Sequence, residues 1–203
     1  MQKYRGDIAK VIELLEQKKS FVISKVLVQE ELAEIERLGL NIIFPFDKTY
    51  PPHILNISDP PLVLSTRGNL SLLQQKQNIA VVGARNASSN GLYIAQELSE
   101  ELSKNHYIIT SGLARGIDTA AHRGSLLRGT IAVMGTGIDH VYPKENNDIF
   151  NKIIDSGGLI ISEYPLGTPP IGFNFPKRNR IISGLAKGVV IVEAAEKSGT
   201  LIT

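Results

Sequence analysis

The sequence predicts an α/β protein: a doubly wound, mostly parallel sheet with a short helical N-terminal extension. From residue 77 onward, short apolar segments alternate with helical patterns, which is typical of βα units that build a parallel sheet. The apolar segments contain almost no polar residues, as strands covered on both faces require. Fifteen of the 18 glycines lie from Gly83 onward, so the composition changes between the two parts of the chain.

The N-terminal part of the chain is predicted to contain two helices and a short strand. Residues 8–17 and 29–38 place apolar side chains at helical spacing, and residues 40–46 are expected to form the strand. Residues 50–69 contain four prolines, which favours an extended chain. We therefore divide the chain into an N-terminal helical extension (1–43), an extended strap or linker (44–76) and a Rossmann-like domain (77–203).

The Rossmann-like domain is predicted to contain five strands and four helices. The strands are residues 79–82, 107–109, 130–134, 159–161 and 189–192. The helices are residues 90–104, 117–127, 145–155 and 179–187, the first with Ile94, Leu98 and Leu102 on one face. Crossovers of this length between parallel strands are right-handed, so the alternation predicts a doubly wound sheet of the Rossmann type.

Composition excludes several classes of protein. The absence of cysteine removes disulfides and thiolate metal sites and fits a reducing, cytoplasmic setting. No stretch approaches the roughly 18 consecutive apolar residues that span a bilayer, and the first residues lack the apolar core of a signal peptide, so we expect no membrane contact. The 22 basic and 20 acidic residues leave a net charge of +2. This bulk charge is too small to predict nucleic-acid binding, so a site for a polyanion must be local.

Glycine-bearing turns follow the first three predicted strands of the Rossmann-like domain. They begin at Gly83, Ser111 and Gly135, and ligands of open α/β sheets bind beyond the carboxyl ends of the strands. Glycine lets backbone N–H groups approach a phosphate at a helix N-terminus. It also serves any turn that needs a positive φ, so an architectural role stays open for each turn alone. Three such turns at one sheet edge favour a phosphate site.

Arginines follow the first two of these strands. Residues 83–91 lack the Gly-x-Gly-x-x-Gly fingerprint, and no acidic residue ends the second strand to hold a ribose, so NAD is not expected and we predict no cofactor. Arg85 and Arg115 take these places instead. A guanidinium suits phosphate because its planar fork donates two parallel hydrogen bonds. A salt bridge to a carboxylate such as Asp118 or Glu163 is the alternative role for either arginine.

The densest signal is residues 173–180, where three cations lie beside two phenylalanines. Cations follow the backbone of a single strand, while its bases stack on aromatic rings for about 1–3 kcal/mol each. Alternatively, the rings are core residues and the cations are the solvated start of a helix. Lys144 adds a cation after the third strand. The candidate DNA-binding residues are Gly83, Arg85, Ser88, Ser111, Gly112, Arg115, Lys144, Phe175, Lys177, Arg178, Asn179 and Arg180.

The sequence offers no set of catalytic residues. It lacks a serine nucleophile elbow, a paired-histidine metal pattern and a Walker loop, and its four histidines are scattered. We therefore predict no catalytic residue, no metal and no enzyme activity. His122 is expected to be structural. Glu163 and Glu193 each end a strand, so either is expected to hold an arginine in place.

Several motifs occur in one order along residues 44–203. They are Tyr50-Pro51, Asp59-Pro60-Pro61, residues 82–85, 111–118, 135–137, 142–143, 162–165, 175–185 and 192–203. Together they resemble the DprA/Smf family of DNA-processing proteins. The resemblance implies a non-enzymatic homodimer that binds single-stranded DNA, protects it and helps load RecA recombinase onto it during natural transformation. It further implies that a basic pocket at the strand ends grips the DNA through Arg85, Lys144 and residues 175–180, and that the chain is C-terminally truncated.

Two other functions stay open at this point. The domain also resembles the lysine-decarboxylase-like nucleotide phosphoribohydrolases, which carry a Pro-Gly-Gly-x-Gly-Thr turn. Residues 195–200 here read Ala-Glu-Lys-Ser-Gly-Thr, so the tight glycine turn is absent, and release of free base from a nucleoside monophosphate would be the observation in its favour. A pure interaction scaffold, in which the glycine turns are architectural, predicts no salt-dependent DNA affinity and no effect of replacing Arg85.

Overall fold

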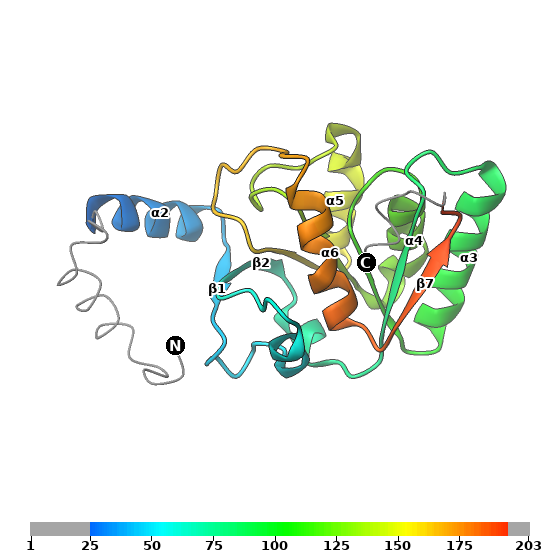
Figure 1. The fold of residues 1–203 in the computed structure, drawn as a ribbon, viewed down its shortest axis with the longest axis horizontal. Coiled ribbons are helices and arrows are strands. Elements are labelled where there is room, and N and C mark those ends of the chain that lie inside the picture. The colour runs from blue at the N-terminus through cyan, green and yellow to red at the C-terminus, as the bar shows by residue number, and fades with distance from the viewer. Residues whose placement is uncertain (1–24, 195–203) are drawn as a thin grey trace.

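The computed structural model describes residues 25–194, with side chains from Val28 onward. The predicted helix 8–17 and the motif at residues 195–203 lie outside these residues. A seven-stranded sheet runs through the molecule in the order β1-β2-β6-β5-β4-β3-β7 (Figure 1). Its strands are β1 (Asn41–Ile43), β2 (Leu64–Gly68), β3 (Asn78–Gly83), β4 (Ile108–Ser111), β5 (Thr130–Met134), β6 (Leu159–Ser162) and β7 (Gly188–Val192). The α-helices are α2 (Lys25–Arg37), α3 (Ser89–Lys104), α4 (Ile117–Ser125), α5 (Asn147–Asp155) and α6 (Asn174–Leu185).

The five strands β3 to β7 are the five that the apolar segments predict, and each lies parallel to its neighbours among them. The chain passes from β3 through β4 and β5 to β6 in one direction and then returns to the other side of β3 for β7. This reversal of strand order is the doubly wound topology. The prediction of a Rossmann-like, mostly parallel sheet is therefore confirmed.

Alternate residues of the central strands pack on opposite faces of the sheet. In β5, Ile131 and Val133 join the cluster that contains the apolar residues of α6, whereas Ala132 and Met134 join the cluster that contains those of α5. Because successive side chains of a strand point to opposite faces, α6 covers one face, and α5 covers the other. Helices α3 and α4 form a third cluster with residues of β3 and β4. The start of α6 therefore lies at the same edge of the sheet as the loops that follow β3, β4 and β5.

Residues 44–76 also contribute to the sheet. Strand β2 pairs antiparallel with β6, and β1 pairs antiparallel with β2. Between these strands Tyr50 is buried, and its hydroxyl donates a hydrogen bond of 2.6 Å to the carbonyl of Pro61. Ile54, in the 3₁₀ turn Pro52–Asn56, packs in the same core cluster as α6. This segment extends the sheet and supports the helix that carries part of the candidate site.

Helix α3 buries small residues more deeply than large ones. Of the apolar face that the sequence predicts, Leu102 packs against the core, whereas Ile94 is 44% exposed and the small residue beside it, Ala95, is buried. Helix α4 packs so closely against α3 that a Cβ atom on Gly124 would collide with the backbone oxygen of Gln96. Only small side chains fit at such a contact, so Ile94 turns toward the outside. The spacing of large apolar residues therefore marks the buried side of this helix only in part.

Helix α6 begins earlier than the predicted start at residue 179. It starts at Asn174 and places Pro176 in its first turn, where the missing N–H of proline has no helical partner to lose. Phe175, Lys177 and Arg178 therefore lie on a helix rather than before it. No helix among residues 25–194 is long and apolar enough to cross a membrane.

Candidate nucleic-acid interface

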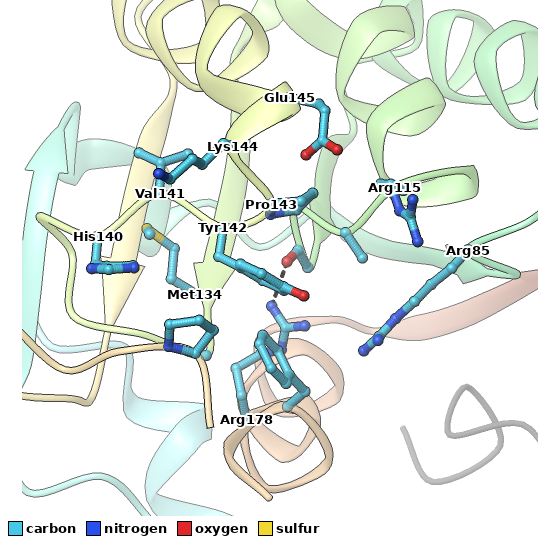
Figure 2. Close-up of a pocket in the computed structure, with 15 residues that line it drawn as sticks. Arg85, Arg115, Met134, His140, Val141, Tyr142, Pro143, Lys144, Glu145 and Arg178 are labelled. Atoms are coloured by element: carbon cyan, nitrogen blue, oxygen red, sulfur yellow. Dashed lines mark hydrogen bonds between the residues drawn. The ribbon is translucent and has the colours of Figure 1, made fainter. Parts of the chain in front are cut away.

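A cavity of about 460 Å³ opens at the carboxyl ends of β3, β4 and β5. We call it the strand-end cavity. The turns after these strands contribute Arg85, Arg115 and Tyr142 to its wall, and α6 contributes Phe175 and Arg178. Figure 2 shows Arg85, Tyr142 and Arg178 converging from separate elements. The glycine-bearing turns that the sequence analysis singled out therefore surround one space.

Arg85 and Arg115 are the exposed arginines of this cavity. Neither forms a salt bridge with a carboxylate in the part of the chain that the structure describes. The predicted alternative, in which a neighbouring acid holds each of them, is thus not realised among these residues. Lys144, also exposed, lines the far side of the cavity from the two arginines (Figure 2). The wall carries positive charge on two sides, with Glu145 as an exposed carboxylate between them.

Two aromatic rings lie beside these cations. The ring centroids of Tyr142 and Phe175 are 5.5 Å apart at an interplanar angle of 37°, and the guanidinium carbon of Arg85 lies 5.4 Å from the Phe175 centroid. A Cβ on Gly135 would come within 2.8 Å of the Phe175 ring, so this turn needs glycine to admit the ring. Tyr142 is 43% exposed and was not among the predicted site residues, although its place two residues before Lys144, in the loop after a predicted strand, was a usable signal.

Arg178 has a different environment from Arg85. It is 3% exposed, and its Nη1 donates to the carbonyl of Gly112 at 2.6 Å and to the carbonyl of Val133. A Cβ on Gly112 would lie 2.6 Å from Nη2 of Arg178 and 2.7 Å from Oδ2 of Asp118, so the arginine and the carboxylate pack together over this glycine. Burial lowers the pKa of Arg178 to about 10, against the opposing effect of the Asp118 charge. Arg178 therefore joins α6 to the ends of β4 and β5.

Polar groups in the turn after β4 form hydrogen bonds within the protein. The amide of Ala114 donates to Oδ2 of Asp118 at 3.3 Å. Burial raises the pKa of Asp118, while the positive charge of Arg178 and the Ala114 hydrogen bond act in the opposite direction. Ser111, fully buried, donates to the carbonyl of Val81 at 2.7 Å. The amide of Ala114 is thus engaged within the turn, and the role of the Gly112 backbone in binding a phosphate stays a prediction.

The turn after β3 is held by a glutamate that follows β7. Glu193 accepts hydrogen bonds from the amide of Ser88 at 2.9 Å and from its hydroxyl at 2.8 Å. The Ser88 hydroxyl also accepts from the amide of Gly91 at 3.0 Å, which caps α3. Among the described residues Glu193 therefore holds a serine and not the predicted arginine. A Cβ on Gly83 would collide with the carbonyl of Val192, so Gly83 lets β7 approach this turn, which carries Arg85.

Arg180 forms the ion pair that was predicted for Glu163. Its Nη1 and Nη2 donate to the two carboxylate oxygens at 2.6 and 2.5 Å, and its Nε donates to the carbonyl of Asp59 at 2.7 Å. This bidentate pair ties α6 to the end of β6 and to the segment before β2. Arg180, Lys177 and Asn179 do not line the strand-end cavity.

The predicted site residues thus separate into three groups. Those that line the strand-end cavity are Arg85, Gly112, Arg115, Lys144, Phe175 and Arg178. Gly83 and Ser111 end β3 and β4, and Ser88 caps α3, so these three do not line it. Lys177, Asn179 and Arg180 lie elsewhere on α6. The exposed members of the first group are the ones able to meet a ligand.

Comparison with known proteins gives a consistent match. The family described as DNA recombination-mediator protein A matches residues 41–203. The chain is 41% identical over 178 residues to Protein Smf of Escherichia coli (strain K12), which covers 87% of this chain and 47% of that protein. It is 46% identical over 159 residues to DNA processing protein DprA of Streptococcus pneumoniae, covering 77% of this chain and 55% of that protein. The chain spans about half the length of these curated relatives.

Two solved structures share the fold. The X-ray structure of DNA processing protein A from Streptococcus pneumoniae matches with a TM-score of 0.74 and 35% identity, over 98% of this chain and 78% of that one. A structure of DNA processing protein A from Helicobacter pylori, which addresses the single-stranded DNA binding mode of that protein, matches with a TM-score of 0.71 and 31% identity. This second match covers 80% of this chain and 73% of the other.

Proposed function

The chain belongs to the family of DNA recombination-mediator protein A, and from that premise we propose that its strand-end cavity binds single-stranded DNA. One observation carries the proposal: two exposed guanidinium groups without a carboxylate partner among the described residues lie beside an accessible pair of aromatic rings. Phosphates need the first feature, and unpaired bases need the second. The relative from Helicobacter pylori, for which single-stranded DNA binding is described, gives independent support.

Arg85 and Arg115 bind phosphate groups in this proposal. Both are held on turns whose backbone is fixed from behind, by Glu193 for the first turn and by Asp118 for the second. A guanidinium on a fixed turn loses less freedom on binding than one on a mobile loop. Lys144, across the cavity, contacts a phosphate on the other side of the same strand segment.

Tyr142 and Phe175 hold the bases. Tyr142 is 43% exposed and Phe175 is half-buried at the cavity wall, so a base that enters the cavity can stack on either ring. A duplex keeps its bases paired and stacked on one another, so it offers no free base face to these rings. The proposal therefore predicts a preference for single strands over duplexes, with little preference for sequence.

Arg178 and Arg180 keep the site in shape rather than bind DNA. Both guanidinium groups are already engaged, the first with two carbonyls beside Asp118 and the second with Glu163. Phosphate contact by either would require breaking these interactions. This assignment narrows the predicted set of DNA-binding cations to Arg85, Arg115 and Lys144.

We further propose that the protein is a binding protein and not an enzyme, and that it acts in the cytoplasm as a homodimer that protects the strand and helps load RecA recombinase onto it. The family resemblance and the family description as a recombination mediator support the RecA role. A dimer would present two strand-end cavities to one strand, and the second contact would be intramolecular, which raises the overall affinity. Sedimentation velocity tests the dimer, and the lag before RecA hydrolyses ATP on a strand coated with single-strand binding protein tests the loading role.

The proposed DNA binding is tested by fluorescence anisotropy of a labelled single strand of about 30 nucleotides, long enough for several sites of the usual size. Arg85→Ala is compared with Arg128→Ala, which removes an exposed arginine at the opposite edge of the sheet, just before β5. Loss of one charge-assisted phosphate contact lowers affinity by about tenfold or more, so we expect that loss for Arg85→Ala only. Unlabelled duplex should compete poorly. Equal DNA binding by the two variants would contradict the proposed binding site. Release of free base from a nucleoside monophosphate would contradict the proposal that the protein is not an enzyme.

A further inference from the structure

A second cavity, of about 340 Å³, lies next to the strand-end cavity and shares Arg85 and Arg115 with it. It runs between the N-terminal half of α3 and one side of α4 and is closed at one end by the loop that carries Arg85. We call it the α3–α4 groove. The two shared arginines form the boundary between the spaces, so a chain of phosphates that contacts them can continue from one into the other.

Each helix turns one face into the groove. Helix α3 contributes Tyr93 and Gln96, which are three residues apart, and α4 contributes Thr119 and Arg123, which are four apart. Residues at these spacings lie on the same side of a helix. An aromatic ring on one wall thus faces a guanidinium on the other, which is the same pairing of groups that the strand-end cavity contains.

Polar side chains on the floor of the groove have hydrogen-bond partners within the protein, whereas those on its rim have none in the part of the chain that the structure describes. The Thr119 hydroxyl donates to the carbonyl of Ala114 at 2.7 Å, and the Asn146 amide donates to the carbonyl of Leu113 at 2.8 Å. By contrast, the side chains of Tyr93, Gln96 and Arg123 form no hydrogen bond or ion pair within residues 28–194. Tyr93 is 63% exposed, so its ring is accessible.

The charge of the groove is positive throughout. Its lining includes Arg85, Arg115 and Arg123 and no aspartate or glutamate. On α3, Glu97 follows Gln96 and is exposed but does not line the groove, and Glu100 and Glu101 pair with Lys104 at the far end of that helix. Three arginines in a lining that contains no carboxylate attract an anion with repeated phosphates.

We propose that the α3–α4 groove is a second nucleotide subsite, into which the single strand continues after passing Arg85 and Arg115. Arg123 contacts a phosphate there, the Tyr93 ring stacks on a base, and the Gln96 amide hydrogen-bonds at the base edge. This inference rests on the proposed function, because the strand-end cavity must first hold the same strand. It goes further in fixing the path of the strand between α3 and α4, from Arg115 before the start of α4 to Arg123 in its last turn.

The test is a length series of labelled oligothymidylates on the full chain, from about 3 nucleotides, which fill only the strand-end cavity, to about 10, which reach the groove. Arg123→Ala and Tyr93→Ala are compared with Tyr93→Phe, which keeps the ring, and with Arg128→Ala, a distant exposed arginine. Because Tyr93 and Arg123 are exposed, these variants should keep the thermal midpoint of the wild type, which a melting curve checks. Affinity is measured at several salt concentrations.

We expect Arg123→Ala and Tyr93→Ala to bind the long strand about tenfold more weakly while binding the short strand like the wild type, and Tyr93→Phe and Arg128→Ala to match the wild type on both. Arg123→Ala should also lower the slope of log affinity against log salt by about 0.7, the value for one phosphate of a single strand, whereas Tyr93→Ala should not. Long-strand binding unchanged in both groove variants, with Arg85→Ala still defective, would overturn the subsite and leave the proposed function intact. Failure of the wild type to bind any strand would overturn both.

Discussion

Replacing Arg178 should destabilise the fold far more than it weakens DNA binding. The Arg178 side chain is 3% exposed. Its guanidinium donates to the carbonyls of Gly112 and Val133 and lies near the carboxylate of Asp118. Arg178→Met keeps most of the length of the side chain but removes every donor. Two buried carbonyls then lose their donor, and the buried carboxylate of Asp118 loses the opposite charge nearby. Leaving a buried charge uncompensated costs about 3–5 kcal/mol.

The expected loss can be read as a shift in thermal midpoint. For a chain of this size, 1 kcal/mol corresponds to roughly 2–4 °C, so Arg178→Met should melt about 6–20 °C below the wild type. Lys177→Met is the matched control, because Lys177 is exposed on the same helix. Circular dichroism melts measure the difference, and a melt of Arg178→Met combined with Asp118→Leu should recover part of it, because an apolar pair replaces the uncompensated charge.

Arg178→Met that melts within about 2 °C of the wild type yet binds single-stranded DNA at least tenfold more weakly would refute this reasoning. That outcome would return Arg178 to the set of DNA-contacting cations that the sequence predicts. The expected outcome at a temperature where both proteins are folded is nearly equal affinity, since Arg85, Arg115 and Lys144 are unchanged.

Three further predictions concern stability. Burial lowers the pKa of His122 to about 3 from its ordinary 6.5. Below pH 6.5 the unfolded chain is therefore protonated at His122 while the folded chain is not, so the free energy of unfolding falls as the pH drops. Urea titrations at pH 7 and pH 5 should show a loss of up to about 2 kcal/mol, which should be absent in His122→Asn. Gly124→Ala should cost about 1–3 kcal/mol of unfolding free energy in the same assay, because its Cβ would collide with α3, whereas Gly172→Ala, with open space around it, should cost little; equal costs would contradict the close packing of the two helices. Ser88→Ala should lose about 1 kcal/mol through the cap of α3 and weaken DNA binding by loosening the turn that carries Arg85, and unchanged stability would show that Glu193 alone holds this turn.

The central strands could be predicted because their sequences leave little choice. Ile131 to Met134 and Leu159 to Ile161 are apolar on both faces, and such short runs between helices predict parallel strands. The same reasoning placed glycine turns and arginines at one sheet edge, which the strand-end cavity bears out for the positions of Arg85 and Arg115.

Burial of individual polar residues could not be predicted in this way. Arg85 and Arg178 are both arginines in glycine-rich or basic surroundings, yet one is exposed and the other buried. The difference depends on Gly112 and Asp118, which come from a distant segment and leave space and charge for only one guanidinium. The buried face of α3 was predicted only in part for a similar reason, because Gly124 on another helix determines which side chains fit.

The most direct test of the central claim is a structure determined with a bound oligothymidylate of about six nucleotides, a length within the usual range of single-strand sites. We expect a phosphate within hydrogen-bond distance of the Arg85 and Arg115 guanidinium groups and a thymine ring stacked on Tyr142 or Phe175. A strand bound at the opposite edge of the sheet, near Arg128, with the strand-end cavity empty, would contradict the account.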